Sequence, residues 1–358
     1  MKTHPVWRGV RMRSVLAGAD PDAPARAVTL PTSWDDAAAA ALASLAPGSR
    51  PAALAQAAEA WIGPLARRAG GAEVANPLSE RLHTLLLLRR GTADAGVWQG
   101  RSEDAPAFVF NLAAFCDPGS GFDATVFAEA VATAFTGLAL AAPGASTISV
   151  RIADLAGLLA ALGIGYDTEA ARDTGTRIAA MLREGAQAAS ASLAARLGTR
   201  MPNFAAVVGP AGPAEALLGA ETAGIAPAFS PTRAGIGLTR TARAWLAAMS
   251  LSAEAALVAL LNGENPLAPP GPASHLAMHD AVAPFLDEMP PRPFIPSNPP
   301  LMQSSRPRRR ELPSRGQGFL KISASRSKRD LSRNWTPLLP LDLPVASAPG
   351  QPRRGLDS

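Results

Sequence analysis

Alanine is by far the commonest apolar residue of this chain, and this feature limits the fold more than any other. Hydrophobic residues make up 47% of the 358 residues, but aromatic residues make up only 5%. Alanine is the strongest helix former, and its small side chain lets helices approach closely. The composition therefore predicts a helix-dominated fold, with a core large enough for one big domain or two ordinary ones.

The chain contains one cysteine, Cys116. One cysteine excludes an internal disulfide framework and any chemistry that needs a cysteine pair within the chain. The N-terminal sequence MKTHPVWRGVRMRS lacks the apolar run of a secretory signal, and no stretch has 18 uninterrupted apolar residues. We therefore expect a cytoplasmic protein that makes no membrane contact.

Charge and proline separate the last 70 residues from the rest. Residues 289–358 hold 13 of the 34 prolines, and 13 Lys/Arg against 4 Asp/Glu give them a charge of +9, whereas the preceding residues carry −4. Such a segment cannot bury enough apolar surface to offset its ordering entropy, so we predict a disordered tail over 289–358. Its charge favours solubility or weak contact with polyanions, not specific DNA binding.

Before residue 289, apolar periodicity and capping residues predict mostly helices. We expect helices over about 34–45 with Ser33 as N-cap, 52–68, 154–162, 239–249, 253–261 and 275–285, an apolar helical stripe from Phe122 to Phe135, a long helix that Asp167 caps and Gly198 ends, and one buried strand over 204–208. The apolar block 85–88 fits a strand or a buried helix equally well.

Motifs for catalysis are sparse. His275 and His279 have the i,i+4 spacing that can clamp a metal, but they lack a third ligand and the glutamate of the zinc-protease pattern. No G-x-S-x-G elbow, Walker loop or Rossmann fingerprint occurs. We expect no metal and no cofactor on these grounds.

One glycine-rich turn follows the predicted strand: Gly209, Pro210, Ala211, Gly212 and Pro213. Free backbone N–H groups before a helix can bind phosphate. Two prolines remove two of these donors, so a plain strand-to-helix turn is the favoured interpretation and a phosphate site is the alternative.

Several short strings occur in a fixed order along the chain. They are VANPLSE at 74–80, NLAAF at 111–115, IADLAGLLAALGIGYDTE at 152–169, VVGPAGP at 207–213, TAGIAPAF at 222–229, HLAM at 275–278 followed by PFLD at 284–287, and ELPSRGQGF at 311–319. Together they resemble segments of the ribonucleotide reductase large chain, closest to its adenosylcobalamin-dependent type. The resemblance covers about 28–68 and 74–320, with an abrupt join between.

The resemblance implies a partial reductase-type α/β barrel over 70–288, preceded by a helical segment over 1–69. In that family the string at 74–80 reads Asn-Pro-Cys-Ser-Glu and supplies the radical-carrying cysteine. Here that position is Leu78, although the flanking Asn76 and Glu80 remain. Both threonines of the family's phosphate turn are replaced, by Ala211 and Pro213. Adenosylcobalamin is implied only by the resemblance.

The resemblance and these departures lead to three hypotheses. The first is a catalytically inactive reductase-like protein that binds a nucleotide or a partner, either a true reductase chain or a second copy of itself. The second is a working reductase component that uses cysteines from another chain, with Cys116 as its only local thiol. The third is a decaying or frame-shifted relic, which the change of character after Phe319 would fit.

Overall fold

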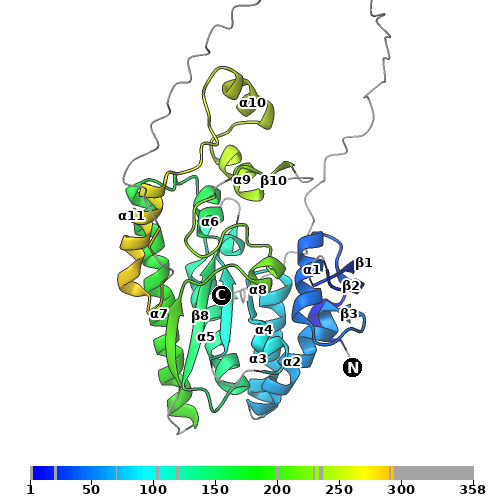
Figure 1. Cartoon of the computed structure of the whole chain (residues 1–358). Coiled ribbons are helices and arrows are strands. Elements are labelled where there is room, and N and C mark those ends of the chain that lie inside the picture. The colour runs from blue at the N-terminus through cyan, green and yellow to red at the C-terminus, as the bar shows by residue number, and fades with distance from the viewer. Residues whose placement is uncertain are drawn as a thin grey trace, which may run out of the picture. The chain divides into compact units, whose positions relative to one another are not determined.

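A mixed four-stranded sheet lies at the centre of the computed structural model (Figure 1), which describes residues 3–19, 22–69, 71–101, 105–117, 121–197, 202–228, 230–233, 237–289 and 292–293. The strand order is β4-β5-β8-β9. Strand β4 (Gly91–Ala93) runs antiparallel to β5 (Ala107–Asn111), whereas β5, β8 (Thr147–Ala153) and β9 (Asn203–Val207) run parallel. The carboxyl ends of three strands therefore meet at one edge of the sheet.

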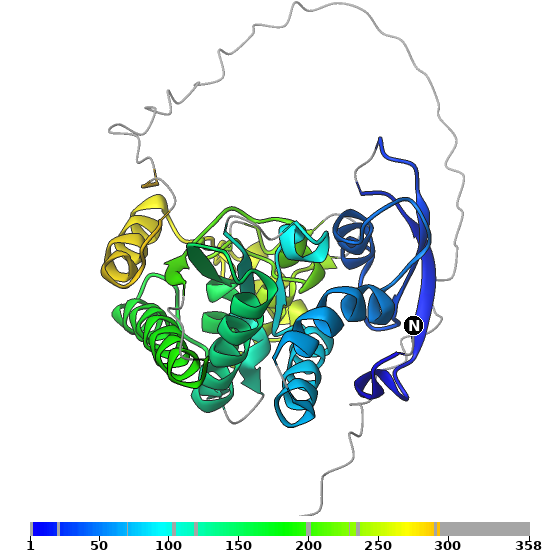
Figure 2. The same ribbon diagram turned by 90° about the horizontal axis from the view of Figure 1, so that it is seen from below.

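Helices cover the two faces of this sheet unequally. Three long helices, α3 (Ala72–Leu87), α5 (Ala124–Ala141) and α7 (Glu169–Leu197), pack on one face (Figure 2). The short helix α8 (Pro213–Leu217) contacts β5 on the other face, where Val109, Ala153, Ala214 and Leu218 form a small separate core. The second face is thus only partly covered by helix.

The N-terminal region adds a second small sheet. Strands β1 (Met12–Ala17), β2 (Arg26–Pro31) and β3 (Ala52–Ala53) pair beside α1 (Asp36–Leu45) and α2 (Leu54–Arg68). The remaining elements are η1 (Pro5–Trp7), α4 (Ala95–Trp98), η2 (Leu112–Phe115), β6 (Cys116–Asp117), β7 (Gly121–Phe122), α6 (Leu155–Ala161), β10 (Thr232–Arg233), β11 (Gly237–Leu238), α9 (Arg240–Ala248), α10 (Ala253–Leu261), α11 (Pro272–Val282) and η3 (Ala283–Phe285). One apolar core runs from the N-terminal helices into the central sheet, and the predicted boundary at residue 70 stays a prediction.

Local sequence explains the central elements. In β8 every second residue, Ile148, Val150 and Ile152, is buried, as a strand with one face on a core requires. In α5, Phe127, Val131 and Phe135 recur at helical spacing and are fully buried. Five phenylalanine rings pack together beside this helix, from Phe108, Phe110, Phe115, Phe122 and Phe127. Aromatic rings therefore supply more of the core than the composition indicated.

The predicted helix-dominated α/β class is confirmed, and the predicted helices and the strand at 204–208 are found within a few residues of their expected bounds. Two predicted caps are wrong. Asp35, not Ser33, caps α1 by accepting from the Ala38 N–H at 2.9 Å, and Thr168, not Asp167, accepts from the Ala171 N–H at 3.2 Å. The block 85–88 belongs to the end of helix α3.

The outer edge of β9 is paired. The Val208 N–H donates to the Glu288 carbonyl at 3.1 Å, and the Asp287 N–H donates to the Ala206 carbonyl at 2.8 Å. The Asp287 carboxylate also accepts from the Ala206 N–H at 2.9 Å. This segment pairs with residues 206–208 and so covers the carboxyl end of a strand edge that would otherwise offer a pairing surface.

One helix, α5, is long and apolar enough to cross a membrane by length and composition, but half of it is buried inside the protein core. Helices α9 and α10 pass the same test only when taken together, across a bend of 87°. The predicted absence of membrane contact stays a prediction. The predicted disordered tail lies outside the described residues from residue 294 onward.

Candidate functional site

The segment that resembles the radical-cysteine motif lies inside helix α3. Leu78 is 6% exposed and belongs to the apolar core, whereas Asn76 and Glu80 are exposed. Asn76 and Glu80 share one helix face because they are four residues apart, and Leu78 points to the opposite side. The polar pair therefore does not frame position 78.

A buried aliphatic side chain in a helix cannot carry a thiyl radical. Adenosylcobalamin serves the resembling family by generating such a radical, so the residues at 76–80 do not fit that cofactor's role.

The glycine-rich turn connects β9 to α8, as predicted. Its Gly212 N–H donates to Oε2 of Glu215 at 2.9 Å, and Glu215 is buried. Pro210 and Pro213 have no N–H, and α8 is only five residues long. The chain's own carboxylate therefore takes the place that a bound phosphate oxygen would need, which supports the interpretation as a plain turn.

A cavity of about 690 Å³ lies beside this turn on the less covered face of the sheet. Its charged lining residues are Asp94, Arg151 and Glu288, with His275 at its border. The Arg151 guanidinium lies 3.9 Å from the Asp94 carboxylate and 4.0 Å from that of Glu215. Burial, followed by the proximity of His279, lowers the pKa of His275, so this ring adds no positive charge at neutral pH.

Acidic groups thus outnumber cations around this cavity. The single guanidinium already faces two carboxylates, and a nucleotide phosphate would have to compete with both. The segment at 76–80 and the turn at 209–213 also lie apart. Gly209 and Pro210 line this cavity, whereas Pro77 and Leu78 line another cavity, between α3 and α5. The structure does not bring the two predicted groups together.

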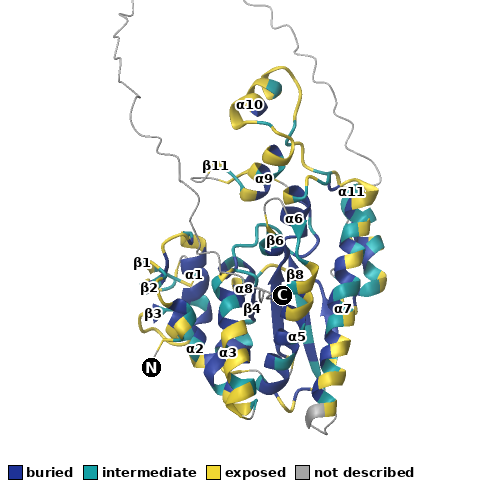
Figure 3. Cartoon of the chain, turned by 180° about the vertical axis from the view of Figure 1, so that it is seen from behind, coloured by how far each residue is buried: buried dark blue, intermediate teal, exposed yellow. Residues whose placement is uncertain are grey.

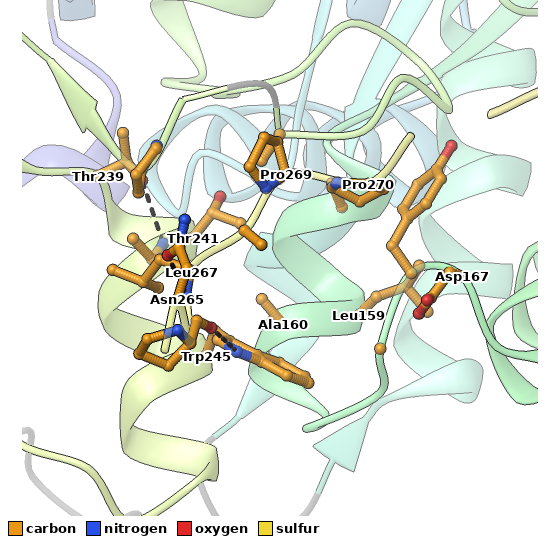
Figure 4. A pocket seen from close by; sticks show the side chains of 18 of the residues that line it. Leu159, Ala160, Asp167, Thr239, Thr241, Trp245, Asn265, Leu267, Pro269 and Pro270 are labelled. Atoms are coloured by element: carbon orange, nitrogen blue, oxygen red, sulfur yellow. Dashed lines mark hydrogen bonds between the residues drawn. The ribbon is translucent and has the colours of Figure 1, made fainter. Parts of the chain in front are cut away.

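A second pocket, of about 330 Å³, lies between α6, α9 and the segment 265–271 (Figure 4). Leu159, Trp245 and several prolines give it an apolar lining. Two of its polar side chains are engaged, since Trp245 Nε1 donates to the Pro266 carbonyl at 3.0 Å and Thr241 Oγ1 donates to Glu221 at 2.8 Å. This pocket can hold an apolar group but offers no nucleophile beside a base.

One buried acid lies at the carboxyl end of β8 and was not singled out by the sequence. Asp154 is 1% exposed and has a left-handed backbone, with φ of 61°. Burial raises its pKa to about 6, although Arg240 and a hydrogen bond from the Thr222 hydroxyl oppose that rise. Its backbone N–H also donates to the Thr222 carbonyl at 3.0 Å, so Asp154 holds the segment around Thr222 against the end of β8.

The remaining predicted groups give no reactive centre. Burial, and then the charge of Asp117, raises the pKa of the Cys116 thiol, which disfavours the nucleophilic thiolate. His275 and His279 both lie on α11, and no cluster of three or more His, Cys, Asp and Glu side chains that could hold a metal occurs among the described residues.

The most unusual surface is helix α10, which Figure 3 shows largely exposed. Only Ala256 of this helix is buried, whereas its large apolar side chains, Leu257, Val258, Leu260 and Leu261, are each more than half exposed. Sequence periodicity placed a helix here but could not show that so little of the described chain lies against it.

Comparison with known proteins adds little. No known sequence family matches the chain, and no curated protein is similar to it. Among solved structures, the α subunit of a class Id ribonucleotide reductase from Actinobacillus ureae is 14% identical, with a TM-score of 0.34. The match covers 51% of this chain and 42% of that subunit, which is too distant to carry an argument about fold or activity.

Proposed function

We propose that this chain is a non-catalytic, reductase-like protein that acts by binding another protein chain through α10. The observation that carries the proposal is the exposure of four large apolar side chains on one nine-residue helix. Apolar surface of this kind on a folded protein is typical of an interaction site. The string resemblance supports the reductase-like part.

The candidate sites for chemistry support a non-catalytic role. Leu78 replaces the radical cysteine and is packed in the core, and the Cys116 thiol has a raised pKa. The turn at 209–213 already satisfies the Gly212 N–H through Glu215, so a nucleotide is the less favoured ligand. These observations favour protein binding over catalysis or nucleotide binding.

The experiment compares association in the source cell. The tagged full-length chain is compared with Leu257→Glu and with Leu16→Glu, a matched control because Leu16 is 77% exposed on β1. We expect the wild type and the control to elute in a complex and Leu257→Glu to elute at the monomer mass. A monomer in all three cases would contradict the proposal.

The alternative, a reductase component that borrows cysteines, predicts a different result. The assay mixes this chain with a nucleotide, adenosylcobalamin, a dithiol and a cysteine-bearing reductase chain. Under the alternative, nucleotide reduction in this mixture depends on Cys116. We expect the Cys116→Ser variant to leave any reduction in this mixture unchanged. Activity that the wild type supports and Cys116→Ser abolishes would favour the alternative.

A further inference from the structure

The apolar side chains of α10 form a stripe on the side away from the protein. Leu257 and Leu261 are four residues apart and share one side of the helix, with Leu260 on one flank and Val258 on the other. Glu254 lies at the N-terminal end of the same side, at an angular position between those of Leu261 and Val258. Ala256, the buried residue, lies about 120° around the helix from the middle of this stripe. The exposed stripe is therefore aimed outward and not toward α9.

The chemistry of the stripe selects its partner. Glu254 is the only charged residue within α10, so nothing on the helix attracts a strongly charged surface. A helix that lies on a lipid surface normally carries lysine and arginine on a polar face, and α10 has neither. The surface that fits is another uncharged, apolar helix.

We propose that α10 pairs with α10 of a second copy of this chain, antiparallel and about a two-fold axis. The inference rests on the proposed function and names its partner. A two-fold contact places the same patch on both copies, so an apolar helix that lacks an apolar counterpart among the described residues finds one in the second copy.

The available area suits a two-fold contact. Leu257 and Val258 are each 57% exposed, Leu260 is 53% exposed, Leu261 is 79% exposed, and Met249 at the end of α9 is 51% exposed. Together they offer on the order of 500 Å² per copy, so a pair removes on the order of 1,000 Å², the lower limit for a specific interface. We therefore expect a reversible dimer and not an obligate one.

Charge fixes the direction of the two helices. A parallel pair would bring the two Glu254 carboxylates side by side, whereas an antiparallel pair places them at opposite ends of the contact. In the antiparallel register the axis passes between Leu257 and Val258, the middle of the stripe. Glu254 of one copy then lies near Leu261 of the other.

The first experiment measures the mass of the purified full-length chain against its concentration by sedimentation equilibrium. We expect a monomer–dimer equilibrium for the wild type and for Leu16→Glu, and a monomer for Leu257→Glu. Circular dichroism should show that all three are folded, because both substituted side chains are exposed.

The second experiment tests the register by oxidative crosslinking in a Cys116→Ser background. We expect Val258→Cys to form a disulfide-linked dimer, and a mixture of Glu254→Cys with Leu261→Cys to form a crosslinked pair. Glu254→Cys alone is the matched control, because its two thiols would lie about 10 Å apart along the helix axis and stay unlinked.

The outcomes separate this inference from the proposed function. If the wild-type chain stays monomeric at all concentrations, the inference that α10 pairs with a second copy is overturned. Binding of the monomer to phosphatidylglycerol vesicles would overturn it as well. If such a monomer still enters a complex in the source cell that Leu257→Glu abolishes, the proposed function stands with a different partner. If Leu257→Glu retains both the dimer and the complex in the source cell, this inference and the proposed function are both overturned.

Discussion

At the scale of single residues, a histidine joins the N-terminus to the centre of the fold. His83 is fully buried in α3, where its Nδ1 accepts from Nε1 of Trp7 at 3.0 Å and its Nε2 lies 3.0 Å from Oε2 of Glu59. The Trp7 indole can only donate, so the neutral ring carries its proton on Nε2. The ring of His4 stacks on it with centroids 4.4 Å apart.

This arrangement predicts a pH-dependent stability. Burial lowers the pKa of His83 below its usual value of 6.5, so the unfolded chain binds the proton more readily. The stabilising contribution is present above about pH 6.5 and is lost as the pH falls through the folded pKa. We expect thermal unfolding to shift to lower temperature between about pH 7.5 and pH 5.5, and His83→Gln to flatten this dependence.

His275→Gln is the comparison for that measurement. The pKa of His275 is also lowered, but the ring is less buried, so this variant should flatten the profile less than His83→Gln does. If the unfolding temperatures of the wild type and His83→Gln depend on pH in the same way, His83 is not the source of the pH dependence.

Asp154 predicts the opposite sign. Its folded pKa of about 6 lies above the value of 3.8 expected when unfolded, so the folded chain holds the proton more tightly and stability falls as the pH rises between them. Two pH units correspond to roughly 3 kcal/mol. In urea unfolding, we expect the stability of the wild type relative to Asp154→Asn to drop by that order from about pH 4 to pH 7. A constant difference would be the contrary result.

At the scale of elements, Glu215 stabilises the start of α8. Its carboxylate accepts from the Gly212 N–H, and the side chain is buried. Removing a buried acceptor of a backbone N–H costs about 1–3 kcal/mol, so Glu215→Ala should lower the free energy of unfolding by that amount. Glu215→Gln keeps an acceptor oxygen and should retain most of the stability. Equal losses in both variants would instead assign the effect to the charge beside Arg151.

Element types were predictable wherever one local signal dominated. The phenylalanine stripe marked α5, and the apolar run at 204–208 marked β9. The strand β5 has no alternation because both of its faces are buried, so periodicity did not predict it. The block 85–88 is apolar throughout, so periodicity could not decide between a strand and a helix there. The cap of α1 was misplaced because two candidates, Ser33 and Asp35, stand two residues apart.

At the scale of the whole molecule, the candidate site was less predictable than the fold. The approach of Glu215 to Gly212 is local, but the packing of Leu78 into the core and the pairing of Glu288 with β9 join residues distant in sequence. Exposure of α10 depends on what the remaining chain leaves uncovered, and no local pattern encodes that. The sequence thus pointed to Leu78 through the string resemblance, but not to the surface that we propose for binding.

The uneven charge along the chain gives the last prediction. Residues 294–358 contain 12 Lys/Arg and 4 Asp/Glu, so a chain that ends at Pro293 changes from a net charge of +5 to −3. Polyanion contact driven by this charge weakens as salt screens it. We expect the full chain to bind a heparin column in a salt-dependent way and the shortened chain to pass through, with thermal unfolding unchanged because the apolar core of the described residues lies before that point. Retention of the shortened chain would place the contact on the described body instead, whose arginines would then be the next to replace.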